Sequence, residues 1–218
     1  MTDAHPELLA MLLADARLPV AGHTQSAGLE PALAAGPVDV PAYVALRLRT
    51  VTRTEAATTV VARAAALAGD PLDEVQAAWA ARTPSAAMRR TSRVMGRALV
   101  RLAPRLVGHR GLPLLPPEPA RPVVVGAIAA AAGLDAATTA RVVGYDDVQT
   151  VVAAALKLTP LDPARATGWV VDAFPALAAM VTDVAALTRA AEIPARNAPV
   201  IEDHAERHTY TTRRLFSA

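Results

Sequence analysis

Residues 123–133, VVVGAIAAAAG, decide the fold class, because they hold the best candidate for a β-strand in the chain. Three consecutive valines favour a strand, since β-branched side chains fit a pleated sheet. The valines run without a break into an alanine-rich stretch, and alanine has the highest helix propensity of all residues. Pro122, directly before them, suits the first turn of a helix. The stretch therefore predicts a helix and, with it, an all-α protein.

The rest of the chain repeats this helical pattern, with apolar residues at intervals of three and four. In the loop 108–122, five of the fifteen residues are proline, which interrupts the pattern. Asp70, Asp135 and Asp162 stand where side chains cap the helices that follow. The sequence predicts a single-domain bundle of about eight to ten helices. The predicted helices are 6–16, 24–35, 41–68, 71–81, 85–107, 122–132, 136–157 and 164–190.

Composition excludes several classes of protein. The 218 residues are 53% hydrophobic, which is enough for one large core. The absence of cysteine excludes disulfides, thiolate metal sites and cysteine nucleophiles. The N-terminal residues have no basic start followed by an apolar run, and Asp172 and Asp183 interrupt the longest apolar window. We therefore expect a cytoplasmic protein that does not span a membrane.

The last stretch, 194–218, differs from the rest, since it is polar, charged and poor in alanine. We expect residues 1–193 to form the helical domain and 194–218 to form a tail that packs only against a partner. A polar segment that carries an apolar pair, Leu215-Phe216, is suited to folding on another protein.

Residues 17–33, RLPVAGHTQSAGLEPAL, gather glycines and hydroxyl residues at the start of a helix. A phosphate-binding loop needs a lysine after its last glycine, but Glu30 follows Gly28 and Leu29. An esterase elbow needs glycine two residues before its serine, where Ser26 has Thr24. Both activities are excluded, and the segment is interpreted as structural.

Two groups of polar residues could carry chemistry. His204 and His208, in HAERH, have the spacing that lets two ligands share one metal from a helix face. Glu206 lies on the other side of that helix, so it cannot serve them as a general base. The pair is either a weak metal site or part of a solvated helix end. Asp146-Asp147 is expected to face solvent or another subunit, and no carboxylate pair indicates acid–base catalysis.

A row of arginines at four-residue spacing marks the helix 85–107. Such a row is either a stripe that faces solvent or a partner, or a surface that follows nucleic-acid phosphates. No aromatic residue interleaves it and no helix-turn-helix pattern precedes it, so a DNA-binding regulator is the alternative rather than the main hypothesis. The arginines of the row are Arg89, Arg93, Arg97, Arg101 and Arg105.

Several fragments, in this order along the chain, resemble the UreF family of urease accessory proteins. The N-terminal family motif is matched by Leu18, Pro19, Val20, Gly22, Ser26, Gly28, Leu29 and Glu30. The helix motif is matched by Arg89, Ser92 and Gly96, and residues 155–161, ALKLTPL, resemble a third segment. The C-terminal motif is matched by Arg207, His208, Arg214, Leu215 and Phe216.

The resemblance implies an all-helical, dimeric adaptor without catalytic activity or a cofactor of its own. Family members bind the accessory protein UreD, also called UreH, and together they recruit the GTPase UreG to apo-urease for nickel insertion. The resemblance also implies that the tail contacts UreD. The residues implied in that contact are Arg207, His208, Arg213, Arg214, Leu215 and Phe216.

Overall fold

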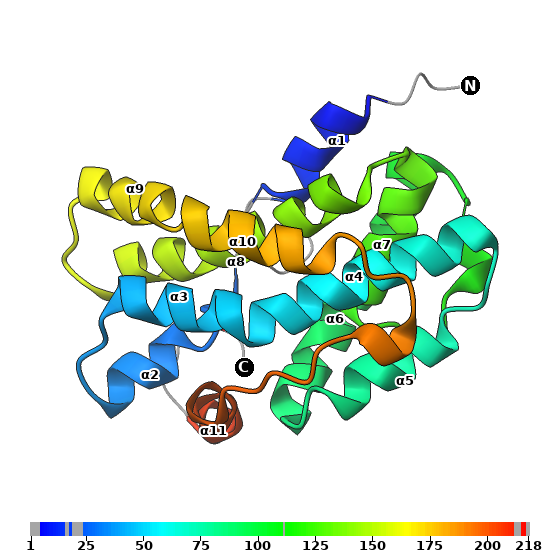
Figure 1. The fold of residues 1–218 in the computed structure, drawn as a ribbon. Helices are drawn as coiled ribbons and strands as arrows, with labels where there is room; N and C mark the ends of the chain where they lie inside the picture. The colour runs from blue at the N-terminus through cyan, green and yellow to red at the C-terminus, as the bar shows by residue number, and fades with distance from the viewer. Residues whose placement is uncertain (1–4, 16–17, 19–23, 111, 212–214, 217–218) are drawn as a thin grey trace.

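The computed structural model describes residues 5–15, 18, 24–110, 112–211 and 215–216. Within these residues the chain is helical and contains no β-strand, so the all-α class is confirmed (Figure 1). The α-helices are α1 (Pro6–Leu13), α2 (Leu29–Ala35), α3 (Val40–Arg49), α4 (Val51–Ala68), α5 (Asp73–Ala81), α6 (Ala86–Val107), α7 (Arg121–Ala132), α8 (Ala136–Leu158), α9 (Pro163–Asp172), α10 (Phe174–Val184) and α11 (Pro199–His208). Short 3₁₀ turns, η2 (Leu112–Leu114) and η3 (Ala190–Glu192), lie between them.

The helix that decides the fold class, α7, is the centre of the core. It packs against α4 and α6, and α4 also packs against α8. Residues 122–129 of α7 are all buried. Gly126 lets α7 approach α4 closely, because a Cβ there would lie 2.6 Å from the Thr59 carbonyl oxygen. A helix apolar on all sides fits this position, since neighbouring helices surround it.

Two long predicted helices are each divided into two. At Thr50, between α3 and α4, the backbone leaves helical geometry (φ −125°, ψ −99°), and its hydroxyl donates to the Leu46 carbonyl oxygen (2.7 Å). Such bonds to the preceding turn bend helices. Between α9 and α10, Pro175 lacks an N–H and obstructs the turn before it, so the chain starts a new helix at Phe174.

Helix starts agree in part with the predicted caps. Asp135 accepts from the Thr138 N–H (2.6 Å), and Asp162 accepts from the Ala164 N–H (3.3 Å). Asp70 makes no such bond, because α5 begins only at Asp73. None of the helices in the described residues has the length and apolar content needed to cross a membrane.

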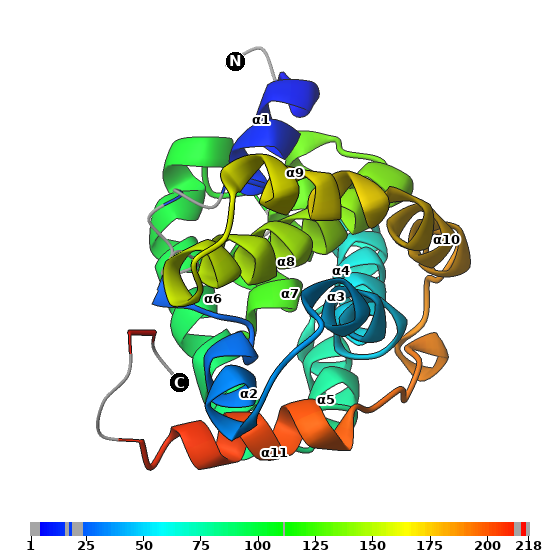
Figure 2. The ribbon, with the colours of Figure 1, turned by 90° about the vertical axis from the view of Figure 1, so that its left-hand side faces the viewer.

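The described part of the segment 194–218 folds back on the body, which differs from the expectation that it packs only against a partner. Its helix α11 lies beside α2 in both views and also packs against α6 (Figures 1 and 2). Ile201 is buried in the core, and Phe216 is only 4% exposed. The polar composition of α11 misled the prediction, since one apolar residue per turn is enough to dock a short helix.

Candidate functional site

The segment before α2 forms a tight turn held from α3. Ala27 and Gly28 both have left-handed backbone angles (φ 51° and 80°), and a Cβ on Gly28 would lie 2.8 Å from the Tyr43 hydroxyl. The Ala27 carbonyl oxygen accepts from Tyr43 Oη (2.9 Å) and from Arg47 Nη1 (2.8 Å). Ser26 Oγ accepts from the Glu30 N–H (3.3 Å) at the start of α2. These hydrogen bonds hold the turn in place against α2 and α3.

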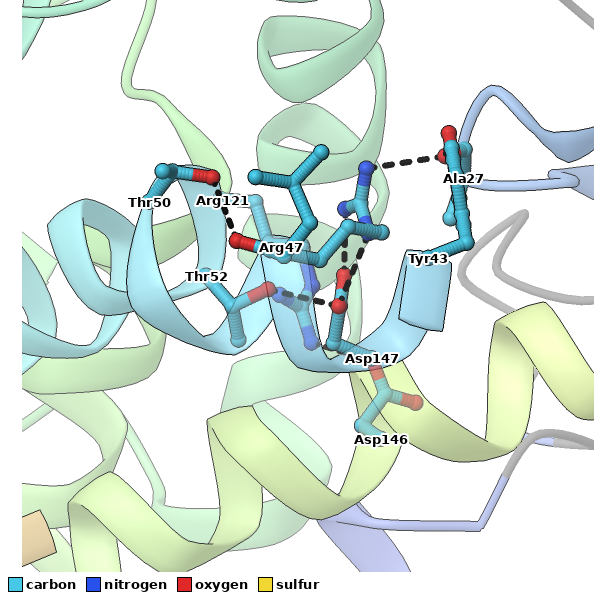
Figure 3. Close-up of polar contacts among 9 residues, drawn as sticks. Ala27, Tyr43, Arg47, Thr50, Thr52, Arg121, Asp146 and Asp147 are labelled. Carbon is cyan, nitrogen blue, oxygen red and sulfur yellow. Dashed lines mark hydrogen bonds and ion pairs between the residues drawn. The ribbon is translucent and has the colours of Figure 1, made fainter. Parts of the chain in front are cut away.

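Arg47 also joins this turn to a buried ion pair with α8 (Figure 3). Its Nε and Nη2 donate to the two carboxylate oxygens of Asp147 at 2.9 and 2.5 Å, and Thr52 Oγ1 donates to the same carboxylate at 2.6 Å. Burial alone would raise the pKa of Asp147, but Arg47 and Thr52 outweigh burial and hold that pKa below its usual range. Asp147 is therefore an ionised, fully hydrogen-bonded link between α3, α4 and α8.

A second charged layer lies next to this pair. Arg121 at the start of α7 pairs with Asp146 (2.6 Å), and burial raises the pKa of Asp146 although Arg121 opposes the rise. Burial also raises the pKa of Glu55, whose carboxylate accepts from Trp79 Nε1 (2.6 Å). Three carboxylates and two guanidinium groups thus lie close together inside the bundle.

These groups line a cavity of about 160 Å³ enclosed mainly by α2, α3, α4, α6, α8 and α11. The cavity has room for several water molecules, and the charged groups on its mostly apolar walls would bind them. Its charged or titratable lining residues are Arg47, Glu55, Arg121, Asp146, Asp147 and His208. The expectation that Asp146-Asp147 faces bulk solvent is wrong, because both side chains pair with arginines and are only 14% and 17% exposed. The alternative, a contact with another subunit, stays a prediction.

Glu30 receives the C-terminal segment. Its two carboxylate oxygens accept from the Leu215 N–H (2.7 Å) and the Phe216 N–H (3.1 Å). His208 Nε2 lies 3.3 Å both from a Glu30 carboxylate oxygen and from the Phe216 carbonyl oxygen. Lys157 Nζ lies 5.2 Å from the centre of the Phe216 ring, a cation–π distance. Segments 185 residues apart in sequence are thus joined at one point.

His204 and His208 have different surroundings. His208 is buried beside Glu30, whereas His204 Nδ1 is buried with no hydrogen-bond partner in the described structure. No group of three or more potential ligands able to hold a metal occurs in the described residues. Glu206 points away from the histidines, as predicted, and accepts from Ser85 Oγ (2.7 Å) and the Ala87 N–H (2.9 Å) at the start of α6.

The helix motif packs α6 against the loop before α7. Ser92 Oγ accepts from the Arg121 N–H (3.1 Å) at the start of α7, whereas Arg89 Nη1 donates to the Thr83 carbonyl oxygen (2.5 Å) in the connection before α6. A Cβ on Gly96 would lie only 2.0 Å from the Pro119 carbonyl oxygen, so no other residue fits there without moving backbone. The three motif residues therefore hold the helices that carry the cavity lining.

Comparisons with known proteins identify the family. The family model of UreF matches residues 35–173. The chain belongs to the UreF family. It is 37% identical over 213 residues to a urease accessory protein UreF of Mycobacterium sp. strain JLS, covering 95% of this chain and 97% of that protein. The protein of the same name from Mycobacterium tuberculosis H37Rv is 37% identical over 158 residues, covering 72% of this chain and 75% of that protein.

A third relative, the urease accessory protein UreF of Mycolicibacterium vanbaalenii, is 35% identical over 215 residues and covers 95% of this chain and 97% of its own length. In this member of the family, the structure brings three motifs together, since Glu30, Lys157 and Phe216 come from the N-terminal motif, the ALKLTPL segment and the C-terminal motif. Leu18 is buried, and Arg207 forms an exposed pair with Asp203 (2.8 Å). The predicted residues Pro19, Val20, Gly22, Arg213 and Arg214 lie outside the described residues.

Proposed function

We propose that this chain is a non-catalytic accessory protein of urease maturation that acts as an adaptor between other proteins. One observation carries the proposal: relatives that match 95% of the chain bear the name urease accessory protein UreF. The positions of the family motifs support an adaptor, because their described residues make structural hydrogen bonds and close contacts. For example, Ser26 accepts from an N–H in the first turn of α2, and Gly96 allows close packing.

The proposed partners are UreD, UreG and apo-urease, with nickel as the cargo that the assembly delivers. The adaptor works as a homodimer in the cytoplasm. It requires no cofactor, membrane or nucleic acid for this role.

The segment 194–218 is the proposed contact with UreD, and 1–193 is the domain that carries it. Exposed apolar side chains at its end support this: Tyr210 is 85% exposed and Leu215 is 72% exposed. Phe216 and His208 are buried against the body, so they hold the segment in place while Leu215 and Tyr210 face outward. Exposed aromatic and aliphatic side chains of this kind anchor protein interfaces.

Co-expression of the chain with UreD and UreG from the same organism, followed by light scattering, tests the proposal. The intact chain is expected to form a complex with UreD that also retains UreG. A Tyr210→Ser, Leu215→Ser variant is expected to lose binding to UreD. The control is Leu8→Ser, Leu67→Ser, which replaces two exposed apolar residues elsewhere and is expected to keep that binding. An intact, folded chain that co-elutes with neither protein would refute the adaptor function.

A further inference from the structure

The solvent-facing side of α6 consists of arginine and one valine. The exposed residues of this helix between 90 and 105 are Arg90, Val94, Arg97, Arg101 and Arg105. At about 100° per residue they fall within roughly 80° of one another, on a strip about 22 Å long. The opposite side faces the cavity through Met88, Ser92 and Met95. We call the exposed strip the α6 arginine face.

Few described carboxylates neutralise this face. Arg97 lies 3.7 Å from Glu118, but both side chains are more than half exposed, so the pair contributes little. Arg90 lies near Glu206, whose carboxylate is already bound by Ser85 and Ala87. Among the described residues, Arg101 and Arg105 form no ion pair within 4.0 Å. The face therefore keeps most of its charge.

The charge of the chain is separated in space. Helix α6 contains six arginines and no Asp or Glu, while the whole chain has a net charge of only +2. The rest of the chain therefore carries a net charge of −4. A cationic strip on a chain whose other residues carry a small net negative charge attracts an acidic surface.

The exposed side chain of Val94 favours a protein interface over a strip that only faces solvent. It is 47% exposed and lies between Arg90 and Arg97, one helical turn from each. An apolar residue surrounded by arginines is the arrangement of an interface whose centre becomes dry and whose rim is charged. Nucleic-acid surfaces instead use aromatic residues for base stacking, and α6 has none.

We propose that the α6 arginine face is a docking surface for an acidic surface of one protein that this adaptor assembles with, separate from the C-terminal contact. The proposal rests on the proposed function, since it names a second contact of the same adaptor. The arginines speed association and set its salt dependence, and Val94 slows dissociation by burying its side chain in the contact.

Binding kinetics of the full-length chain with UreD, UreG and apo-urease, each taken separately, test this proposal at low and at 0.3 M salt. The test variant is Arg90→Glu, Arg101→Glu. The control is Arg49→Glu, Arg141→Glu, which changes the net charge equally at exposed arginines on α3 and α8, outside both proposed contacts. Val94→Ser tests the apolar centre. Circular dichroism checks that every variant is folded, and a 20-base-pair DNA duplex is tested alongside.

One protein is expected to associate with the α6 variant at least about tenfold more slowly at low salt, with the difference shrinking at high salt. The control stays within about twofold of the unmodified chain, and Val94→Ser raises the dissociation rate of the same protein. If all three proteins bind the α6 variant as they bind the unmodified chain, the docking surface is refuted while the adaptor function stands.

Three other results overturn the proposal. If DNA binding is strong and only the α6 variant loses it, the face binds nucleic acid. If Arg90→Glu, Arg101→Glu changes only the mass of the isolated chain in light scattering, the α6 arginine face joins two copies of this chain. If the unmodified chain binds none of the three proteins, the adaptor function and the docking surface both fail.

Discussion

Replacing Asp147 with Asn tests whether the buried ion pair holds the bundle together. The change keeps the size of the side chain and an acceptor for Thr52, but it leaves the Arg47 guanidinium without a counter-charge. Removing one partner of a buried pair costs about 3–5 kcal/mol. The Asp147 side chain is 17% exposed toward the cavity, which places the expected loss near the lower end, about 3 kcal/mol. For a chain of this size such a loss lowers the melting temperature by roughly 6–12 °C.

The double variant Arg47→Met, Asp147→Leu is the control for this prediction. Replacing both charges with apolar groups removes the unpaired ion, so it should recover most of the stability lost by Asp147→Asn. The Ala27 carbonyl oxygen keeps its bond from Tyr43 in that variant. Urea denaturation, monitored by circular dichroism, measures the free energy of unfolding of both variants. A loss below about 1 kcal/mol for Asp147→Asn would show that solvent screens Arg47 and that the pair is not buried.

Three further variants have defined outcomes. Burial raises the pKa of Glu55, so its pKa in the folded chain lies above that in the unfolded chain, and ionising it lowers stability as pH rises. Glu55→Gln keeps an acceptor for Trp79 and removes this cost. It should therefore raise the melting temperature more at pH 8 than at pH 5. Gly96→Ala should cost about 3 kcal/mol or more in urea denaturation, whereas Gly168→Ala, with open space around it in α9, should stabilise by up to about 1 kcal/mol. Glu30→Gln keeps only one acceptor oxygen for two N–H groups, so hydrogen exchange of the Leu215 and Phe216 amides should accelerate about tenfold or more. The control Glu74→Gln, at an exposed glutamate, should leave these exchange rates unchanged.

Local features of the sequence predicted local structure well. Asp135 and Asp162 cap helices because capping depends on a side chain and the next three residues, all of which are visible in sequence. The helix over 123–132 followed from propensity and length in the same way. The division at Thr50 was not predictable from pattern, since the apolar spacing continues across it and only the backbone angles change.

The buried charges were the main failure of the sequence prediction, and one signal could have identified them. Asp147 lies four residues after Val143 and four before Val151, both buried, so it had to share their side of α8. Its partner Arg47 is 100 residues away in sequence, and no local pattern pairs the two. The contact between Glu30 and the C-terminal segment was missed for the same reason, because it joins the two ends of the chain.

The most direct test of the adaptor function measures nickel in urease. Urease would be purified from cells that carry the complete set of urease genes of the source organism, with the gene for this chain present, deleted or restored. The adaptor function predicts that deletion leaves urease assembled but poor in nickel and weakly active, and that the restored chain brings back both nickel content and activity. Urease that is equally rich in nickel with and without this chain would contradict it.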